Sequence, residues 1–214
     1  MTKHPEQRVG VFIDVQNLYY SAKNLFHAKV DFGKVLKEAV GPRKLIRAFA
    51  YVIQAQLPEE KKFFTALDSQ GFEVKMKDLQ VFVTGDKKGD WDVGMTIDAI
   101  KVAPQLDVIV LVTGDGDYIP AIEYLQYHGT QMEVIAFGET TSSRLKEIAD
   151  DFTDLSENRE HFLIREYKNR PRPSTATPTR STTPSSSARP APTRTPARPP
   201  ARTRTPVRRR TVRR

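Results

Sequence analysis

The sequence contains no cysteine and only four histidines, and these shortages exclude several kinds of chemistry. Without cysteine there is no disulfide framework, no thiolate zinc site and no cysteine nucleophile. The histidines are scattered and show no metal-ligand spacing. No apolar run approaches the roughly 20 residues that span a bilayer, and residues 1–8 lack the apolar segment of a secretory signal. We therefore expect a cytoplasmic protein with no membrane partner.

Acidic residues are absent from the last part of the chain, which has 214 residues and a formal net charge of +8. Residues 1–168 contain 21 Lys and Arg and all 26 Asp and Glu, so their net charge is −5. Residues 169–214 contain 13 Arg, no Lys, 10 of the 15 prolines and no aromatic residue, and their net charge is +13. This composition buries too little surface to offset the entropy of ordering. We predict one domain over 1–168 and a disordered, basic tail over 169–214.

The tail has two interpretations that the sequence leaves open. Its Thr-Arg-Thr-Pro repeats at 193–196 and 203–206 are typical of an extended, polyproline-like spacer. Unopposed arginines also suit an arm that binds nucleic acid, because the guanidinium group matches phosphate geometry. A polybasic membrane contact is less favoured, since no lipidation motif or amphipathic helix accompanies the arginines.

The domain alternates short β-branched runs with helical patterns, which favours parallel βαβ units. The predicted strands are 9–13, 45–53, 72–75, 107–112 and 132–137, whereas 79–83 fits either a strand or a loop. The predicted helices are 19–27, 31–41, 58–71, 90–102, a segment from Asp117 to Tyr127, and 142–150. Within 90–102, the spacing of Val93, Ile97 and Ile100 predicts a core-facing stripe. The result is a three-layer α/β fold with a mostly parallel sheet, in which the very apolar strand 107–112 is central.

Acidic residues recur where open α/β sheets bind their ligands. Asp14 follows the first predicted strand, Asp115 and Asp117 follow the central one, and Asp92 lies in the first turn of a helix. In open parallel sheets, ligands bind beyond the carboxyl ends of the strands where the strand order reverses. If the two strands are neighbours at that point, Asp14 and Asp115 converge on one crevice.

Clustered carboxylates repel each other near neutral pH unless a cation neutralises them. Mg²⁺ takes oxygen ligands and keeps several waters, one of which can attack a phosphorus. Asn17, one turn after Asp14, can orient a ligand or a water without adding negative charge. The sequence therefore predicts a divalent-metal site that needs no Cys, His or Ser nucleophile.

Several of these residues also have simpler interpretations. An aspartate at a strand-to-helix turn is often only an N-cap, which applies most to Asp117 and to Asp90. Asp98 lies about 120° from Asp92 around an ideal helix, so it either borders the pocket or faces solvent. Trp91 could stack on a base, but packing is the simpler role.

Three segments resemble the signature blocks of NYN-domain proteins, which belong to the PIN-like nuclease superfamily. They are FIDVQN at 12–17, KGDWDVGMTIDA at 88–99 and VTGDGDYIP at 112–120, and a stretch over 134–155 resembles the closing strand and helix. The resemblance covers roughly residues 8–156 and leaves the tail untouched. It implies a three-layer αβα, PIN-like (Rossmann-like) fold and cleavage of RNA phosphodiesters that depends on Mg²⁺ or Mn²⁺.

The resemblance also implies roles for individual residues. The implied catalytic set is Asp14, Asn17, Asp92, Asp115 and Asp117. The four aspartates of this set would be the metal ligands, with Asp14 and Asp115 central and Asp92 presented from its helix. Thr113 stands at a small hydroxyl position before the Gly-Asp, and Asp98 matches an acidic position whose role stays open.

The leading hypothesis is a metal-dependent ribonuclease whose basic tail helps to bind RNA. One alternative is a non-catalytic RNA-binding or regulatory protein that uses the same domain as a scaffold. Another is a small-molecule phosphatase, which is disfavoured because a basic arm suits a long polyanion rather than a small ester. The sequence leaves open RNA versus DNA, endonuclease versus exonuclease, and whether the chain forms a homo-oligomer.

Overall fold

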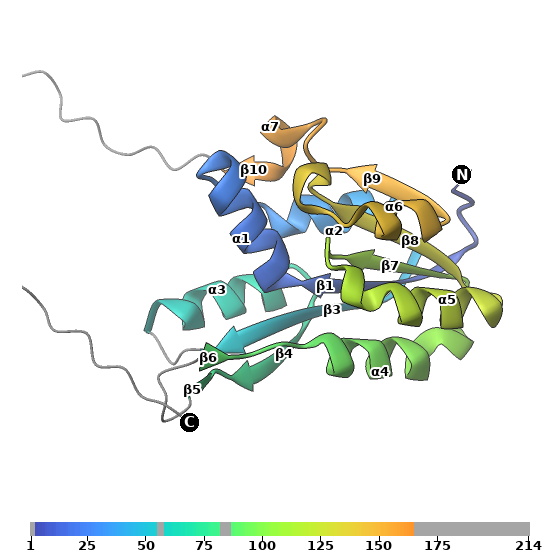
Figure 1. Cartoon of the computed structure of the whole chain (residues 1–214), viewed down its shortest axis with the longest axis horizontal. Helices are drawn as coiled ribbons and strands as arrows, with labels where there is room; N and C mark the ends of the chain where they lie inside the picture. The colour runs from blue at the N-terminus through green and yellow to red at the C-terminus, as the bar shows by residue number, and fades with distance from the viewer. Residues whose placement is uncertain (1–2, 55–57, 82–86, 165–214) are drawn as a thin grey trace, which may run out of the picture. The chain divides into compact units, whose positions relative to one another are not determined.

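A six-stranded sheet forms the centre of the computed structural model, which describes residues 3–54, 58–81 and 87–164 (Figure 1). The strands, in their order across the sheet, are β4 (Glu73–Asp78), β3 (Lys44–Gln54), β1 (Arg8–Asp14), β7 (Val108–Val112), β8 (Gln131–Ala136) and β9 (Asp151–Asp154). Every neighbouring pair in this sheet is parallel. The predicted α/β class with a mostly parallel sheet is therefore confirmed, whereas the predicted tail lies outside the described residues.

The strand order reverses between β1 and β7. From β1 the chain builds outward to β3 and β4, and it then returns to β7 before continuing to β8 and β9. Ile13 of β1 is level with Val112 of β7, so the carboxyl ends of the two strands lie side by side. All five residues of β7 are buried, as expected for an internal strand. The structure thus meets the condition under which Asp14 and Asp115 converge.

Helices cover both faces of the sheet and complete three layers (Figure 1). One face packs against α1 (Val15–Phe26), α2 (Phe32–Val40), α3 (Pro58–Ser69) and α7 (Arg159–Phe162). The other face packs against α4 (Asp92–Val102), α5 (Ile119–Tyr127) and α6 (Ser143–Ile148). Along β1 the pleat divides the two cores, because Val9, Val11 and Ile13 face the first set and Phe12 faces the second.

Short elements join these layers. Two antiparallel pairs link β2 (Lys29–Val30) with β10 (Leu163–Ile164) and β5 (Gln80–Val81) with β6 (Lys87–Lys88). Three 3₁₀ turns are η1 (Ala103–Gln105), η2 (Gly116–Tyr118) and η3 (Gly138–Thr140). The ambiguous segment 79–83 therefore contributes the strand β5, and its residues 82 and 83 lie outside the described part. None of the helices described could cross a bilayer, since none is long and apolar enough.

The predicted start and end of α2 are confirmed. The side chain of Asp31 accepts a hydrogen bond from the backbone N–H of Lys34 at 3.1 Å, as an N-cap does. Gly41 ends the helix with a φ of 56°, a left-handed conformation that favours glycine.

Two predictions about α4 are wrong. The helix begins at Asp92 with Trp91 at the N-cap position, so Asp90 is not its cap. Val93 and Ile97 are 74% and 44% exposed, and the buried face instead consists of Met95, Ala99 and Val102. Apolar residues occupy both sides of this helix, so spacing alone does not decide which side packs. The side that includes the small residue Ala99 faces the sheet, where it packs in the same core as the aromatic side chains of Phe12 and Phe49.

A buried ion pair lies at the end of α2. The Arg43 guanidinium donates to both carboxylate oxygens of Glu133 on β8, at 2.6 and 2.9 Å, and to the backbone oxygens of Ala39 and Val40. The two charged side chains are 0% and 4% exposed. Arg43 thus satisfies the last carbonyls of the helix while pairing with the sheet.

Candidate metal centre

Asp14 and Asp115 come together at the point where the strand order reverses. Asp14 ends β1 and caps α1, and its Oδ1 accepts a hydrogen bond from the backbone N–H of Asn17 at 3.0 Å. Asp115 follows β7 and caps η2, and its Oδ1 accepts from the backbone N–H of Asp117 at 3.0 Å. Both residues therefore act as caps. Their carboxylates also lie at the carboxyl end of the sheet, close enough for the charge of Asp115 to act on Asp14. The cap interpretation offered for Asp117 belongs instead to Asp115.

Asp92 joins this end of the sheet from another layer. It is the first residue of α4, and one carboxylate oxygen each from Asp92, Asp115 and Asp117 lie within 4.8 Å of one another. Asp14 is outside this set of three, but it is close enough for the charges of Asp92 and Asp115 to act on it. The structure thus gathers the four predicted carboxylates from three segments of the chain, because Asp115 and Asp117 share the turn after β7. We call them the acid cluster.

Burial and mutual repulsion act on two of these carboxyl groups. Burial is the largest cause that raises the pKa of Asp14 to about 6 from 3.8, and the charges of Asp92 and Asp115 add to it. Hydrogen bonding from Asn17 partly opposes the shift. The pKa of Asp92 is also raised, again chiefly by burial. The protein therefore holds these carboxylates where their negative charge is costly.

No lysine or arginine within the described ranges forms an ion pair with the acid cluster. The atoms of the acid cluster that could coordinate a metal are all carboxylate oxygens. Hard divalent cations such as Mg²⁺ and Mn²⁺ prefer such ligands. A cation at this place would offset the repulsion that adds to the effect of burial on the pKa of Asp14. The donor set therefore fits a divalent metal ion.

Tyr118 positions Asp92, a role that the sequence did not reveal. Its ring is fully buried, and its hydroxyl donates to Oδ1 of Asp92 at 3.1 Å. Burial is the main cause that raises the pKa of this phenol, and the charges of Asp14 and Asp92 add to it, so the hydroxyl stays protonated and can donate. The available signal was its place directly after Asp117, because a buried tyrosine needs a polar partner.

Asn17 and Thr113 hold the loop that carries Asp115. The side-chain oxygen of Asn17 accepts from the backbone N–H of Gly114 at 2.9 Å, and the hydroxyl of Thr113 accepts from the backbone N–H of Asp115 at 3.2 Å. A Cβ atom on Gly114 would lie 3.2 Å from the backbone oxygen of Thr140, so the close approach of that loop favours glycine. The oxygen of Asn17 thus joins α1 to the β7 loop.

Asp98 and Trp91 have partners away from the acid cluster. Asp98 accepts a hydrogen bond from the hydroxyl of Tyr51 at 3.2 Å and lies 3.8 Å from the amino group of Lys75. The indole N–H of Trp91 donates to the backbone oxygen of Val52 at 2.8 Å, and its ring packs edge-on against Tyr51. Trp91 therefore has the packing role, which anchors the start of α4, and Asp98 belongs to a neighbouring polar contact.

The class of protein follows from comparison with known families. The sequence model of the NYN domain matches residues 8–156. The chain belongs to the NYN family, a family of PIN-like nucleases, and it carries an acidic cluster that could bind a metal ion.

Individual relatives agree with this membership. The chain is 30% identical to "Low amplitude and bright protein LabA" of Synechococcus elongatus, over 80% of this chain and 94% of that protein. It is 27% identical to the uncharacterised protein MJ0482 of Methanocaldococcus jannaschii, over 71% of this chain and 57% of that protein. A crystal structure of VPA0982 from Vibrio parahaemolyticus, a protein of unknown function, matches with a TM-score of 0.69 and 32% identity, over 77% of this chain and all of that one.

Proposed function

We propose that this protein is a metal-dependent ribonuclease, a hydrolase that cuts RNA phosphodiester bonds. The observation that carries the proposal is the acid cluster at the carboxyl ends of β1 and β7. It brings three carboxylate oxygens within 4.8 Å of each other, and no described lysine or arginine side chain forms an ion pair with it. Such a cluster repels a phosphodiester unless a divalent cation lies between them. Membership in a family of PIN-like nucleases supports the same reaction class.

Each residue of the acid cluster would have a specific role in such a site. Asp92, Asp115 and Asp117 would hold Mg²⁺ or Mn²⁺, and Asp14 would complete the ligand set. The bound ion would stabilise charge on the phosphate oxygens and make a coordinated water more acidic. Tyr118 keeps the carboxylate of Asp92 in one orientation through its hydrogen bond.

RNA, rather than a small phosphate ester, is the substrate that the charge distribution favours. The 13 arginines of residues 169–214 attract a long polyanion, whereas residues 1–168 have a net charge of −5. A small ester that fills the cluster would gain little from positive charges attached at a distance along the chain. We therefore assign the basic segment to RNA binding.

The test is single-turnover cleavage of end-labelled RNA by the purified full chain, with Mg²⁺, with Mn²⁺ or with EDTA. We expect cleavage with either metal and none in EDTA. Asp115→Asn keeps the shape and the cap but loses a charged ligand, so cleavage should fall by at least 100-fold.

Asp98→Asn is the matched control, because it removes a carboxylate from the same helix as Asp92 but outside the acid cluster. This variant should cut RNA within about threefold of the wild type. Cleavage by Asp115→Asn at the wild-type rate would refute the metal-nuclease assignment. Metal binding without any cleavage would instead favour a regulatory, RNA-binding role.

A further inference from the structure

Two cavities meet between α1 and α3, beside the acid cluster but outside it. The first has a volume of about 650 Å³, and its lining includes Val15, Gln16 and Tyr20 of α1 and Phe63 of α3. The second has a volume of about 430 Å³ and ends at Ile164. Tyr19 and Phe63 line both cavities, so the two are adjacent at these side chains. We call the two cavities together the α1–α3 groove.

One end of the groove opens next to the acid cluster. Val15 and Gln16 directly follow Asp14 in the chain, and both line the first cavity. At the other end Ile164 is the last residue that the structure describes, and the Arg-rich segment 169–214 follows it closely in the sequence. A strand that occupies both cavities would therefore run from the residues next to Asp14 toward Ile164.

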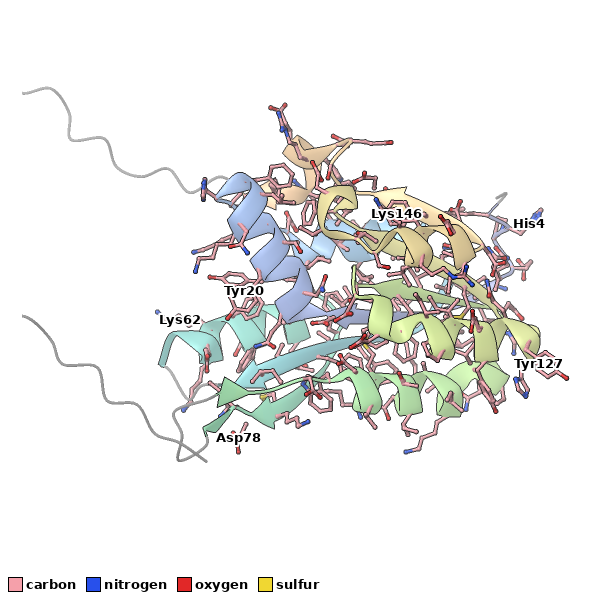
Figure 2. All side chains as sticks on the ribbon, in the orientation of Figure 1. His4, Tyr20, Lys62, Asp78, Tyr127 and Lys146 are labelled. Carbon is pink, nitrogen blue, oxygen red and sulfur yellow. The ribbon has the colours of Figure 1, made fainter. Side chains whose placement is uncertain are left out.

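Aromatic rings in this groove remain accessible. Tyr20 is 52% exposed and Phe63 is 37% exposed, although both are large apolar side chains. Figure 2 shows Tyr20 projecting from α1 on the side of α3. The rings of Tyr19 and Tyr20 meet edge-to-face with centroids 5.3 Å apart, which fixes their orientation. Accessible, oriented rings are the platforms on which unpaired nucleobases stack.

Positive charge accompanies the rings. The amino group of Lys23 lies 5.6 Å from the centroid of the Tyr19 ring, and Lys29 lines the second cavity. Two acidic residues also line the groove, Asp31 in the second cavity and Glu60 in the first. The Asp31 carboxylate caps α2 and lies 3.6 Å from the amino group of Lys34, and Glu60 is engaged with a partner of its own. Aromatic faces with lysines beside them bind both parts of a nucleotide, the base and the phosphate.

We propose that the α1–α3 groove binds the unpaired nucleobases of single-stranded RNA next to the phosphate that lies at the acid cluster. This proposal rests on the proposed ribonuclease function and specifies its substrate as single-stranded. Paired bases of a duplex are stacked on each other, and their faces are not available to Tyr20 or Phe63. The groove thus selects a strand by its exposed bases, and the acid cluster acts on the adjacent backbone.

The experiment measures RNA binding by the full chain with fluorescence anisotropy. EDTA is present so that cleavage does not interfere. The probes are a labelled single-stranded RNA and the same strand annealed to its complement, in enough salt to weaken contacts from the arginines. The wild type should prefer the single strand. Tyr20→Ala and the double variant Tyr20→Ala/Phe63→Ala should weaken single-strand binding by roughly 5- to 150-fold for each ring lost. Duplex binding should change little.

Two further variants separate stacking from other effects. Tyr20→Phe keeps the ring and should bind as the wild type does. Tyr127→Ala removes an 88% exposed tyrosine from α5 and should leave binding unchanged. If the double variant melts early, Tyr20→Ala alone decides, because half of that side chain is already exposed.

The outcomes distinguish this proposal from the function on which it rests. Unchanged single-strand affinity in Tyr20→Ala, with metal-dependent cleavage by the wild type intact, would overturn the groove and leave the nuclease. A wild type that prefers duplex RNA would likewise overturn it. Absence of both RNA binding and RNA cleavage in the wild type would refute the ribonuclease function itself.

Discussion

Asp14 has two roles that act on its charge in opposite directions. As the cap of α1 it accepts a hydrogen bond from Asn17, which favours the carboxylate, but burial and its acidic neighbours raise its pKa to about 6. The folded protein therefore holds this proton more tightly than the unfolded chain, where the pKa is near 3.8. The sign follows from proton linkage: without metal, the contribution of Asp14 to stability falls as the pH rises from about 4 to above 6.

We predict that Asp14→Asn stabilises the protein in EDTA at pH 7.5, by at most about 3 kcal/mol in the free energy of unfolding. The substitution removes a buried charge and keeps the cap, because Asn caps helices about as well as Asp. At about pH 3, where both states hold most of the proton, the difference should nearly vanish. Urea unfolding of both proteins at the two pH values measures this. A variant less stable than the wild type at pH 7.5 would contradict the prediction.

Tyr118 acts in the site through its hydrogen bond to Asp92. We predict that Tyr118→Phe leaves the fold intact but lowers Mn²⁺ affinity by about 10- to 100-fold, the usual cost of losing a group that orients a metal ligand. Tyr51→Phe is the matched control, because it removes a similar hydrogen bond from Asp98, outside the acid cluster. Calorimetric titration with Mn²⁺ compares the two. Equal affinities for both variants would remove the positioning role of Tyr118.

At the scale of elements, the buried pair of Arg43 and Glu133 joins the end of α2 to β8. We predict that Arg43→Ala destabilises the protein by about 3–5 kcal/mol, because it leaves the Glu133 carboxylate buried and unpaired by a cation. Arg47→Ala breaks the pair with Glu73, whose side chains are 39% and 46% exposed, and should cost less than about 1 kcal/mol. Urea unfolding measures both losses. Similar losses for the two variants would show that burial does not govern the contribution of Arg43.

The elements also show what the sequence could and could not predict. The convergence of Asp14 with Asp115 was predictable, because both follow apolar strands and only the order of those strands was missing. The buried face of α4 was not, because Val93 and Met95 are both apolar and only packing against the sheet selects one of them. The hydrogen bond between Tyr118 and Asp92 joins residues 26 positions apart, so it depends on how η2 meets α4. The place of Tyr118 directly after Asp117 indicates a residue near the site but does not identify its partner.

For the whole molecule, the division of charge is the dominant property. Residues 1–168 have a net charge of −5 and residues 169–214 have a net charge of +13, although the chain as a whole has only +8. The two core clusters and the acid cluster lie entirely within the first part. We therefore expect the first part to fold and to bind metal without the basic segment. We also expect that segment to add to RNA affinity, because the first part has a net charge of −5.

We predict that removing residues 169–214 leaves a folded, metal-binding domain with weaker RNA affinity and a shallower dependence on salt. For single-stranded nucleic acid, the slope of log K against log salt concentration is about −0.7 for each phosphate that the protein neutralises. Even if only half of the 13 arginines engage phosphates, the slope of the full chain should be steeper by about 4 or more than that of the truncated one. A full-length chain with glutamine in place of these arginines is the control for length, and it should behave as the truncated chain does. Titrations of a labelled RNA between 50 and 300 mM KCl, roughly the range over which such slopes are resolved, provide both values. Equal slopes for the full and truncated chains would mean that the basic segment does not contact RNA and is a spacer.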